Sequence, residues 1–183
     1  MSAVLRRRAD HTGQGRKPGR AAKASRAIEG SHRAKGLRIG IAVSRFNELV
    51  TDRLLEGALE TLRDAGVVQQ DVTVVRVPGA FELPLAARLL LRRRGCDAVI
   101  CLGAVIRGET PHFDYIAHAT ATGIVTVGVT EERPVVFGVL TTDTAEQALA
   151  RADHSGVNRG AEAAITAIEM ATLARRLDEK KPR

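Results

Sequence analysis

The stretch DAVICLGAVI (97–106) is the most apolar strand candidate in this chain of 183 residues. Strands covered by helices on both faces read as continuous apolar runs, whereas strands with one solvated face alternate. We therefore expect a central strand of a parallel sheet here. The run is followed at once by RGETPH (107–112), which crowds charged residues, a glycine and a threonine-proline pair together. Such crowding indicates a site at the end of the strand.

Short apolar runs and helical patterns alternate on both sides of this strand. The sequence predicts further strands at 37–44, 72–78 and 135–142, and helices at 49–62, 81–94, 144–152 and 159–177. Connections are short, and glycine or proline stands at several of the expected ends. This order predicts an α/β protein: a flavodoxin-like three-layer αβα sandwich with a parallel four-stranded sheet.

The segment 111–131 admits two interpretations. IVTVGV (124–129) favours a strand by residue propensity. Apolar and small residues recur at steps of three and four, however, which is the buried stripe of one long helix; they are Phe113, Ile116, Ala117, Thr120, Ile124 and Val127. We predict a helix.

Charge divides the chain into a basic tail and a nearly neutral domain. Residues 1–38 hold 11 Lys and Arg against two acidic residues, whereas residues 39–183 hold 17 against 19. The net charge of +7 therefore says little about the folded part. We expect a disordered basic extension (1–36), one domain (37–177) and a charged C-terminal tail (178–183). An Arg-rich, acid-poor start is also typical of organellar transit peptides, but without a secretory apolar region we expect a cytoplasmic protein.

Other motifs limit the function classes. No apolar run reaches the length of about 18 residues that spans a membrane. Cys96 and Cys101 flank the run DAVI (97–100) at the start of the expected buried strand. We expect reduced core residues, because a zinc site would need more ligands nearby. There is no Walker loop, GxGxxG, zinc spacing or Ser-His-Asp order, so nucleotide hydrolysis, dinucleotide binding and metal catalysis are weakly supported.

The carboxyl ends of the four predicted strands lie on one rim, where ligands of such sheets bind. After the third strand, Thr110 is a candidate helix N-cap and Pro111 suits the first helical position. A helix start with free N–H groups is an anion site, and His112 in its first turn could exchange protons near neutral pH. Ordinary capping is the alternative for the helix start, and Arg107, Gly108 and His112 in the same few residues weigh against it. For His112 a structural role stays an equal alternative.

Aromatic and basic residues suggest a ligand with a ring and a phosphate. Phe46, Phe81 and Phe137 fall near strand ends or in the last strand, which favours stacking on a flat ring over core packing alone. Glu82 could bind donors on that ring or partner a helix dipole. Arg151 and Arg159 bracket a loop, and their planar forks suit phosphate, although solvated helix-end arginines would give the same pattern.

The chain resembles the 6,7-dimethyl-8-ribityllumazine synthase family over about residues 37–177. The resemblance rests on the strings SRFN (44–47), VRVPGAFELP (75–84), LGAVIRGETPHFDYIA (102–117), VVFGVLTTDTAEQALARA (135–152) and NRGAEAAITAIEMA (158–171). It implies a transferase of riboflavin biosynthesis, without metal or organic cofactor. Its substrates are 5-amino-6-(D-ribitylamino)uracil and L-3,4-dihydroxy-2-butanone 4-phosphate, and phosphate and water are released.

The resemblance also implies roles by position. His112 matches the proton donor, while Glu109, Thr110 and Arg151 match the phosphate site, with Arg159 standing where a lysine is expected. The pyrimidine substrate would contact Phe46, Ala80, Phe81, Glu82, Ala104, Val105, Ile106 and Phe137. Phe137 and Arg151 would come from a neighbouring subunit. The resemblance therefore implies a homo-oligomer of pentamers, alone, paired or closed into a sixty-subunit shell, with riboflavin synthase as a candidate partner.

Two other classes stay open at the level of sequence. One is a cage or assembly whose basic tail binds nucleic acid weakly and without sequence preference. The other is a flavodoxin-like module that binds a flavin or lumazine without making it. The sequence leaves Arg107 without an assigned role.

Overall fold

The structure is a computed structural model that describes residues 27–154 and 156–179. Its sheet contains β1 (Ile39–Ser44), β2 (Val72–Val77), β3 (Ala98–Ile106) and β4 (Val135–Thr142) in the spatial order β2-β1-β3-β4. All three neighbouring pairs are parallel, with Ile39 of β1 opposite both Val72 and Ala98. The predicted parallel four-stranded α/β architecture is confirmed.

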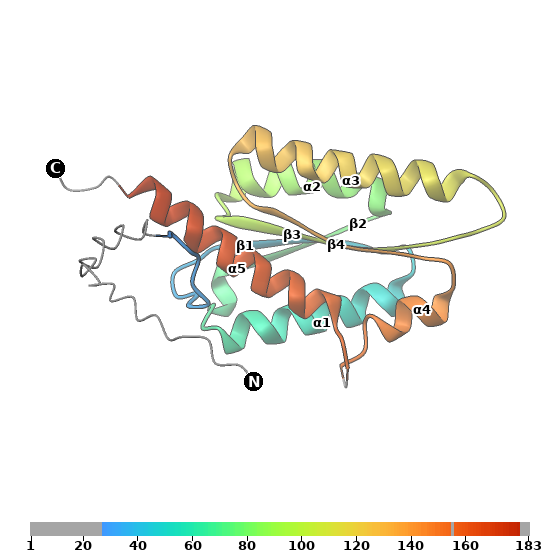
Figure 1. The fold of residues 1–183 in the computed structure, drawn as a ribbon, viewed down its shortest axis with the longest axis horizontal. Helices are drawn as coiled ribbons and strands as arrows, with labels where there is room; N and C mark the ends of the chain where they lie inside the picture. Colours follow the sequence, from blue (N-terminus) through green and yellow to red (C-terminus); the bar gives the residue numbers. More distant parts are fainter. Residues whose placement is uncertain (1–26, 155, 180–183) are drawn as a thin grey trace, which may run out of the picture.

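Helices cover both faces of the sheet. Figure 1 shows α2 (Leu83–Leu89) and α3 (His112–Glu131) on one side, and α1 (Glu48–Asp64), α4 (Ala145–Ala150) and α5 (Arg159–Asp178) on the other. Each layer buries its own apolar cluster against the sheet. β3 lies between them with its first seven residues fully buried, as expected of the central strand.

The ambiguous segment is helical. α3 runs unbroken from His112 to Glu131, so periodicity rather than strand propensity decided its structure. Thr120 and Ile124 of the predicted stripe are its two buried residues, whereas Val125 and Val129 between the stripe positions are exposed.

The prediction of one regular helix at 81–94 was wrong. The structure divides it into a 3-10 turn η2 (Ala80–Glu82), the α-helix α2, and a π-helical turn η3 (Leu90–Arg94). Pro84 lies in the first turn of α2, where its missing N–H is tolerated. Gly95, at a φ of 61°, ends the segment in the left-handed region that glycine adopts without strain. A further 3-10 turn, η1 (Gln69–Asp71), precedes β2.

Both cysteines are buried and free, which agrees with the prediction of reduced core residues. Burial raises the pKa of the Cys96 thiol, and it raises that of Cys101 to about 12. Within the described ranges no group of three or more His, Cys, Asp or Glu could hold a metal ion. In the same part of the chain, no helix is long and apolar enough to cross a membrane.

The last residues of the predicted tail pack against α5. Ser31 exchanges hydrogen bonds with Thr172: its N–H donates to the hydroxyl over 2.7 Å, and its carbonyl accepts from that hydroxyl over 3.0 Å. Ala34 is fully buried, and Arg175 donates to the carbonyl of Gly36. Packing therefore begins several residues before position 37. Residues 1–26 of the extension predicted to be disordered (1–36) lie outside the described residues.

Candidate active site

A pocket of about 500 Å³ opens at the carboxyl ends of β1 and β3. The strand order places the topological switch point there, since β1 leads to β2 on one side and β3 leads to β4 on the other. Nine predicted site residues line this pocket: Phe46, Ala80, Phe81, Glu82, Ala104, Val105, Ile106, Thr110 and His112. Segments far apart in the sequence thus supply one cavity.

Two exposed phenylalanines flank the pocket. The side chains of Phe46 and Phe81 are 71% and 59% exposed, so neither serves mainly to fill the core. Exposed rings beside a cavity can stack on a flat heteroaromatic ligand, which agrees with the interpretation made from their positions.

Asn47 joins the two strand ends beneath the pocket. Its backbone adopts the left-handed conformation, at a φ of 60°, and its side-chain amide donates to the carbonyl of Ala104 over 2.8 Å. Asparagine tolerates this conformation better than most residues. The sequence analysis quoted Asn47 within SRFN without giving it a role; an asparagine three residues after the end of a buried strand was the available signal.

Glu82 is partly engaged by its own turn. One carboxylate oxygen accepts from the N–H of Gly79 over 2.9 Å, which closes the start of η2. Of the two alternatives for Glu82, the capping role is therefore present in the isolated chain. The other carboxylate oxygen has no hydrogen bond to the residues described and remains available at the pocket wall.

The start of α3 differs by one residue from the prediction. Pro111 rather than Thr110 holds the cap position, and no side chain caps this end. The proline ring holds φ at −62°, which already suits a helix, so the turn begins at Pro111, whose carbonyl accepts from Asp114 over 3.0 Å. His112 is then the first helical residue, exposed and facing the pocket rim. The uncapped N–H groups can bind an anion.

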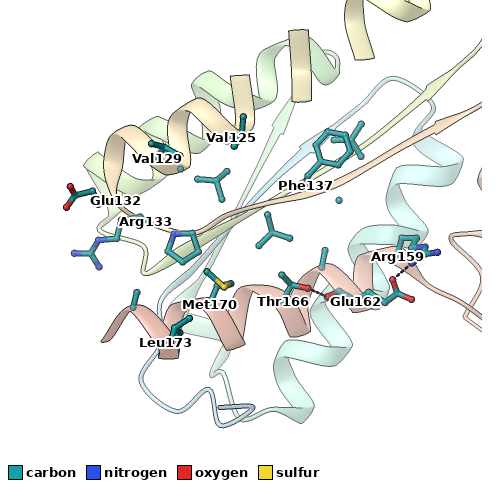
Figure 2. Close-up of a pocket in the computed structure, with 18 of the residues that line it drawn as sticks. Val125, Val129, Glu132, Arg133, Phe137, Arg159, Glu162, Thr166, Met170 and Leu173 are labelled. Carbon is teal, nitrogen blue, oxygen red and sulfur yellow. Dashed lines mark hydrogen bonds and ion pairs between the residues drawn. The ribbon is translucent and has the colours of Figure 1, made fainter. Parts of the chain in front are cut away.

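Phe137, Arg151 and Arg159 do not reach this pocket. They line a second hollow of about 830 Å³ between α3 and α5, over the edge strand β4. Figure 2 shows Val125 and Val129 of α3 opposite Met170 and Leu173 of α5, with the ring of Phe137 standing on β4. Glu109 lines neither pocket. The site residues of one chain thus fall into two groups.

The two arginines of this second group differ in their partners. The backbone N–H of Arg159 donates to the carbonyl of Arg151 over 2.9 Å, so the ends of the intervening loop are adjacent. The Arg159 guanidinium pairs with Glu162 (Figure 2), whereas that of Arg151 donates to the backbone carbonyl of Gln147. Arg151 has no carboxylate partner among the described residues, which leaves its charge available to a ligand.

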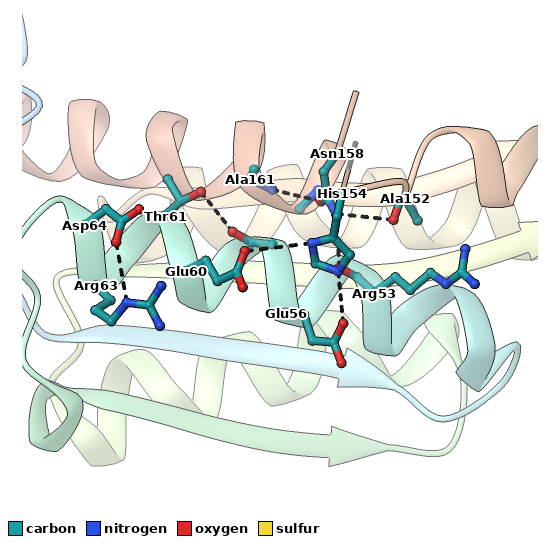
Figure 3. A network of polar contacts seen from close by, with 12 residues as sticks. Arg53, Glu56, Glu60, Thr61, Arg63, Asp64, Ala152, His154, Asn158 and Ala161 are labelled. Atoms are coloured by element: carbon teal, nitrogen blue, oxygen red, sulfur yellow. Dashed lines mark hydrogen bonds and ion pairs between the residues drawn. The ribbon is translucent and has the colours of Figure 1, made fainter. Parts of the chain in front are cut away.

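Asn158 fastens this loop to α1, and sequence reasoning missed it. Its carbonyl oxygen caps α5 by accepting from Gly160 and Ala161, and its amide donates to the carbonyls of Arg53 and Ala152 (Figure 3). Asparagine before a helical pattern is an N-cap signal, but the contact with α1 spans 105 positions. No local pattern indicates it.

One comparison decides the family. The family model described as 6,7-dimethyl-8-ribityllumazine synthase matches residues 36–175, which is most of the chain. The chain belongs to this family. Lumazine synthases are transferases of riboflavin biosynthesis that act on small molecules as homo-oligomers.

Membership in the lumazine synthase family confirms the resemblance and gives the two pockets a common context. The second hollow, between α3 and α5 over β4, is called the β4 groove below. In a homo-oligomer another copy can cover this apolar groove, whereas in a monomer it would stay exposed to water. The roles of individual site residues stay predictions.

Proposed function

We propose that this chain is a 6,7-dimethyl-8-ribityllumazine synthase. It condenses 5-amino-6-(D-ribitylamino)uracil with L-3,4-dihydroxy-2-butanone 4-phosphate. The observation that carries this proposal is the pocket at the switch point, where His112 and eight other predicted site residues line one cavity. We also propose that residues 37–177 form the single domain that carries this activity.

The proposed reaction needs proton transfers and an anion site. The 5-amino group attacks the ketone, and loss of water gives an imine. Elimination then breaks the C–O bond and releases phosphate, and ring closure with loss of a second water gives the lumazine. His112 moves protons at the pocket rim, where its imidazole has no hydrogen-bond partner among the described residues. The uncapped start of α3 holds the phosphate.

The proposed site is shared between neighbouring copies in a pentamer-based oligomer. His112 and Arg151 line separate pockets in one chain, and Phe137 stands in the same groove as Arg151. If the groove of one copy docks beside the pocket of the next, Arg151 can stabilise the departing phosphate there. Arg159 is also positively charged, but its guanidinium is paired with Glu162. We therefore propose Arg151 rather than Arg159 as the main phosphate ligand.

The direct test mixes the purified full-length protein with both substrates and follows lumazine absorbance and phosphate release. Acceleration over the spontaneous reaction is expected. A flavin- or lumazine-binding module would bind product without releasing phosphate, and that result would defeat the proposal.

Sharing of the site is tested by mixing two impaired variants and assaying them at a butanone phosphate concentration far below KM, where both have low activity. His112→Ala and Arg151→Ala proteins are dissociated, combined in equal amounts and reassembled. Random assembly places an intact His112 beside an intact Arg151 at about a quarter of the sites, so activity should recover to about that fraction. A site contained within one chain would recover none.

A further inference from the structure

Arg107 connects three elements at the rim of the sheet. Its Nε donates to Asp143 Oδ1 over 3.0 Å, and its two terminal nitrogens donate to both oxygens of Asp114 over 3.2 and 3.3 Å. The guanidinium carbon lies 4.1 Å from the centre of the Phe113 ring. A single side chain therefore holds the end of β3, the first turn of α3 and the turn between β4 and α4, all at the same end of the sheet (Figure 1).

The segment it closes has little other support. Residues 108–111 are exposed, and the side chains of Glu109 and Thr110 make no hydrogen bond within the described part of the chain. A side chain on Gly108 would meet open space. The Arg107 N–H fixes the start of the segment by donating to the carbonyl of Thr142 over 2.9 Å. The Arg107 side chain fixes its end, and a short loop held at both ends has few conformations left.

We propose that Arg107 is a positioning residue for the phosphate-binding end of the pocket, an inference that rests on the proposed function. It grips the two residues that follow His112 and thereby holds the imidazole and the uncapped N–H groups of α3 in one orientation toward the substrate anion. It acts through Phe113 and Asp114, because its charge is already matched by two carboxylates.

The geometry requires a guanidinium rather than any cation. Two parallel N–H groups meet both oxygens of Asp114, a third bond reaches Asp143, and the flat group covers Phe113. Lysine offers a point charge that cannot make these contacts together. The hydrogen bonds that Arg107 donates to Asp114 and then to Asp143 also raise the pKa of Arg107, so its guanidinium stays charged while both carboxylates are ionised.

The test uses full-length Arg107→Lys, Arg107→Met and Asp114→Asn proteins. Arg92→Lys is the matched control, because Arg92 grips Glu131 at the other end of the 20-residue helix α3, about 30 Å away. We measure kcat, KM for each substrate, the Kd for inorganic phosphate by calorimetry, and Tm.

Each Arg107 and Asp114 variant should raise KM for the butanone phosphate and Kd for inorganic phosphate by about 10- to 100-fold. KM for the pyrimidine should change less than about threefold, and Tm should stay within a few degrees because exposed ion pairs contribute little stability. Arg92→Lys should match the wild type in all five quantities.

Three outcomes would overturn the inference. Full retention of phosphate affinity in Arg107→Lys would show that charge alone suffices. Equal losses in Arg92→Lys, or unchanged phosphate affinity in Arg107→Met, would remove the positioning role. A wild type whose phosphate affinity depends on Arg107 in this way but that forms no lumazine would instead defeat the proposed function and leave the positioning role standing.

Discussion

Asn158 uses the full hydrogen-bonding capacity of its side chain, so replacing it by aspartate isolates two bonds. Its oxygen accepts from the N–H groups of Gly160 and Ala161 over 2.9 and 3.1 Å. Its nitrogen donates to the carbonyls of Arg53 and Ala152 over 3.1 and 3.3 Å, as Figure 3 shows. Only 8% of the residue is exposed, and an amide has two donors and two acceptor positions to offer. Aspartate keeps the shape and the cap but has no donor.

The loss of stability in Asn158→Asp comes mainly from the carbonyls of Arg53 and Ala152, which no longer receive a hydrogen bond from this side chain. Each buried acceptor that loses its donor costs about 1–3 kcal/mol, with Arg53 at the low end because its carbonyl still accepts a helical bond within α1. The carboxylate also faces two oxygens, while the start of α5 returns roughly 0.3–1 kcal/mol by favouring negative charge. We expect a loss of about 2–4 kcal/mol in the free energy of unfolding. Asn158→Ala also loses the cap, worth about 1 kcal/mol more.

Urea unfolding at fixed protein concentration measures this loss, since assembly affects stability. Gln147→Glu is the matched control: it makes the same amide-to-carboxylate exchange on exposed α4 and keeps the oxygen that accepts from the N–H of Asp143. That variant should stay within about 0.5 kcal/mol of the wild type. If Asn158→Asp were equally stable, the two donor bonds would not hold the loop to α1, and the reasoning would be refuted.

Four further substitutions test other parts of the structure. Arg151→Ala should raise KM for the butanone phosphate about 10- to 100-fold, and His112→Ala should mainly lower kcat, by about 100-fold, in steady-state kinetics; the reverse pattern would exchange their roles. Gly160→Ala should cost about 3 kcal/mol in thermal unfolding, because its Cβ would stand 1.9 Å from the carbonyl oxygen of Leu54, and a neutral effect would show that α1 and α5 separate freely. Burial raises the pKa of Cys101 to about 12, so from about pH 9 upward the unfolded thiol loses its proton first and stability should fall by up to about 1.4 kcal/mol per pH unit. Urea unfolding of Cys101→Ala should show a flatter decline, and an identical slope would contradict the assigned cause.

Periodic features of this fold could be predicted from the sequence, because they depend on near neighbours. The strand at 135–142 has the predicted bounds, and the stripe through Thr120 and Ile124 correctly gave a helix despite the strand propensity of IVTVGV (124–129). The run 81–94 failed because its apolar pattern cannot distinguish a regular helix from 3-10 and π-helical turns joined around α2. Backbone hydrogen bonding there depends on packing, which periodicity does not record.

The pocket was predictable for a different reason: strand ends of a parallel sheet converge by topology, wherever they lie in the sequence. The contacts that fix the geometry of the site are not of this kind. Arg107 reaches Asp143 across 36 positions, and Asn47 reaches Ala104 across 57. Each is a single polar pair without a repeat, so only the folded chain identifies it.

The separation of the site residues bears on why the chain carries an open apolar groove. The side chains of Val125, Val129 and Met170 are exposed beside Phe137 and the two arginines. Monomeric soluble proteins rarely expose a contiguous apolar patch of this kind. Under the proposed function the groove stays apolar because a neighbouring copy covers it in the same contact that completes the active site. In that proposal, docking would bury the apolar residues and deliver Arg151 to the His112 pocket of the neighbour. Catalysis would then begin only after assembly, so an isolated subunit could fold correctly and still be inactive.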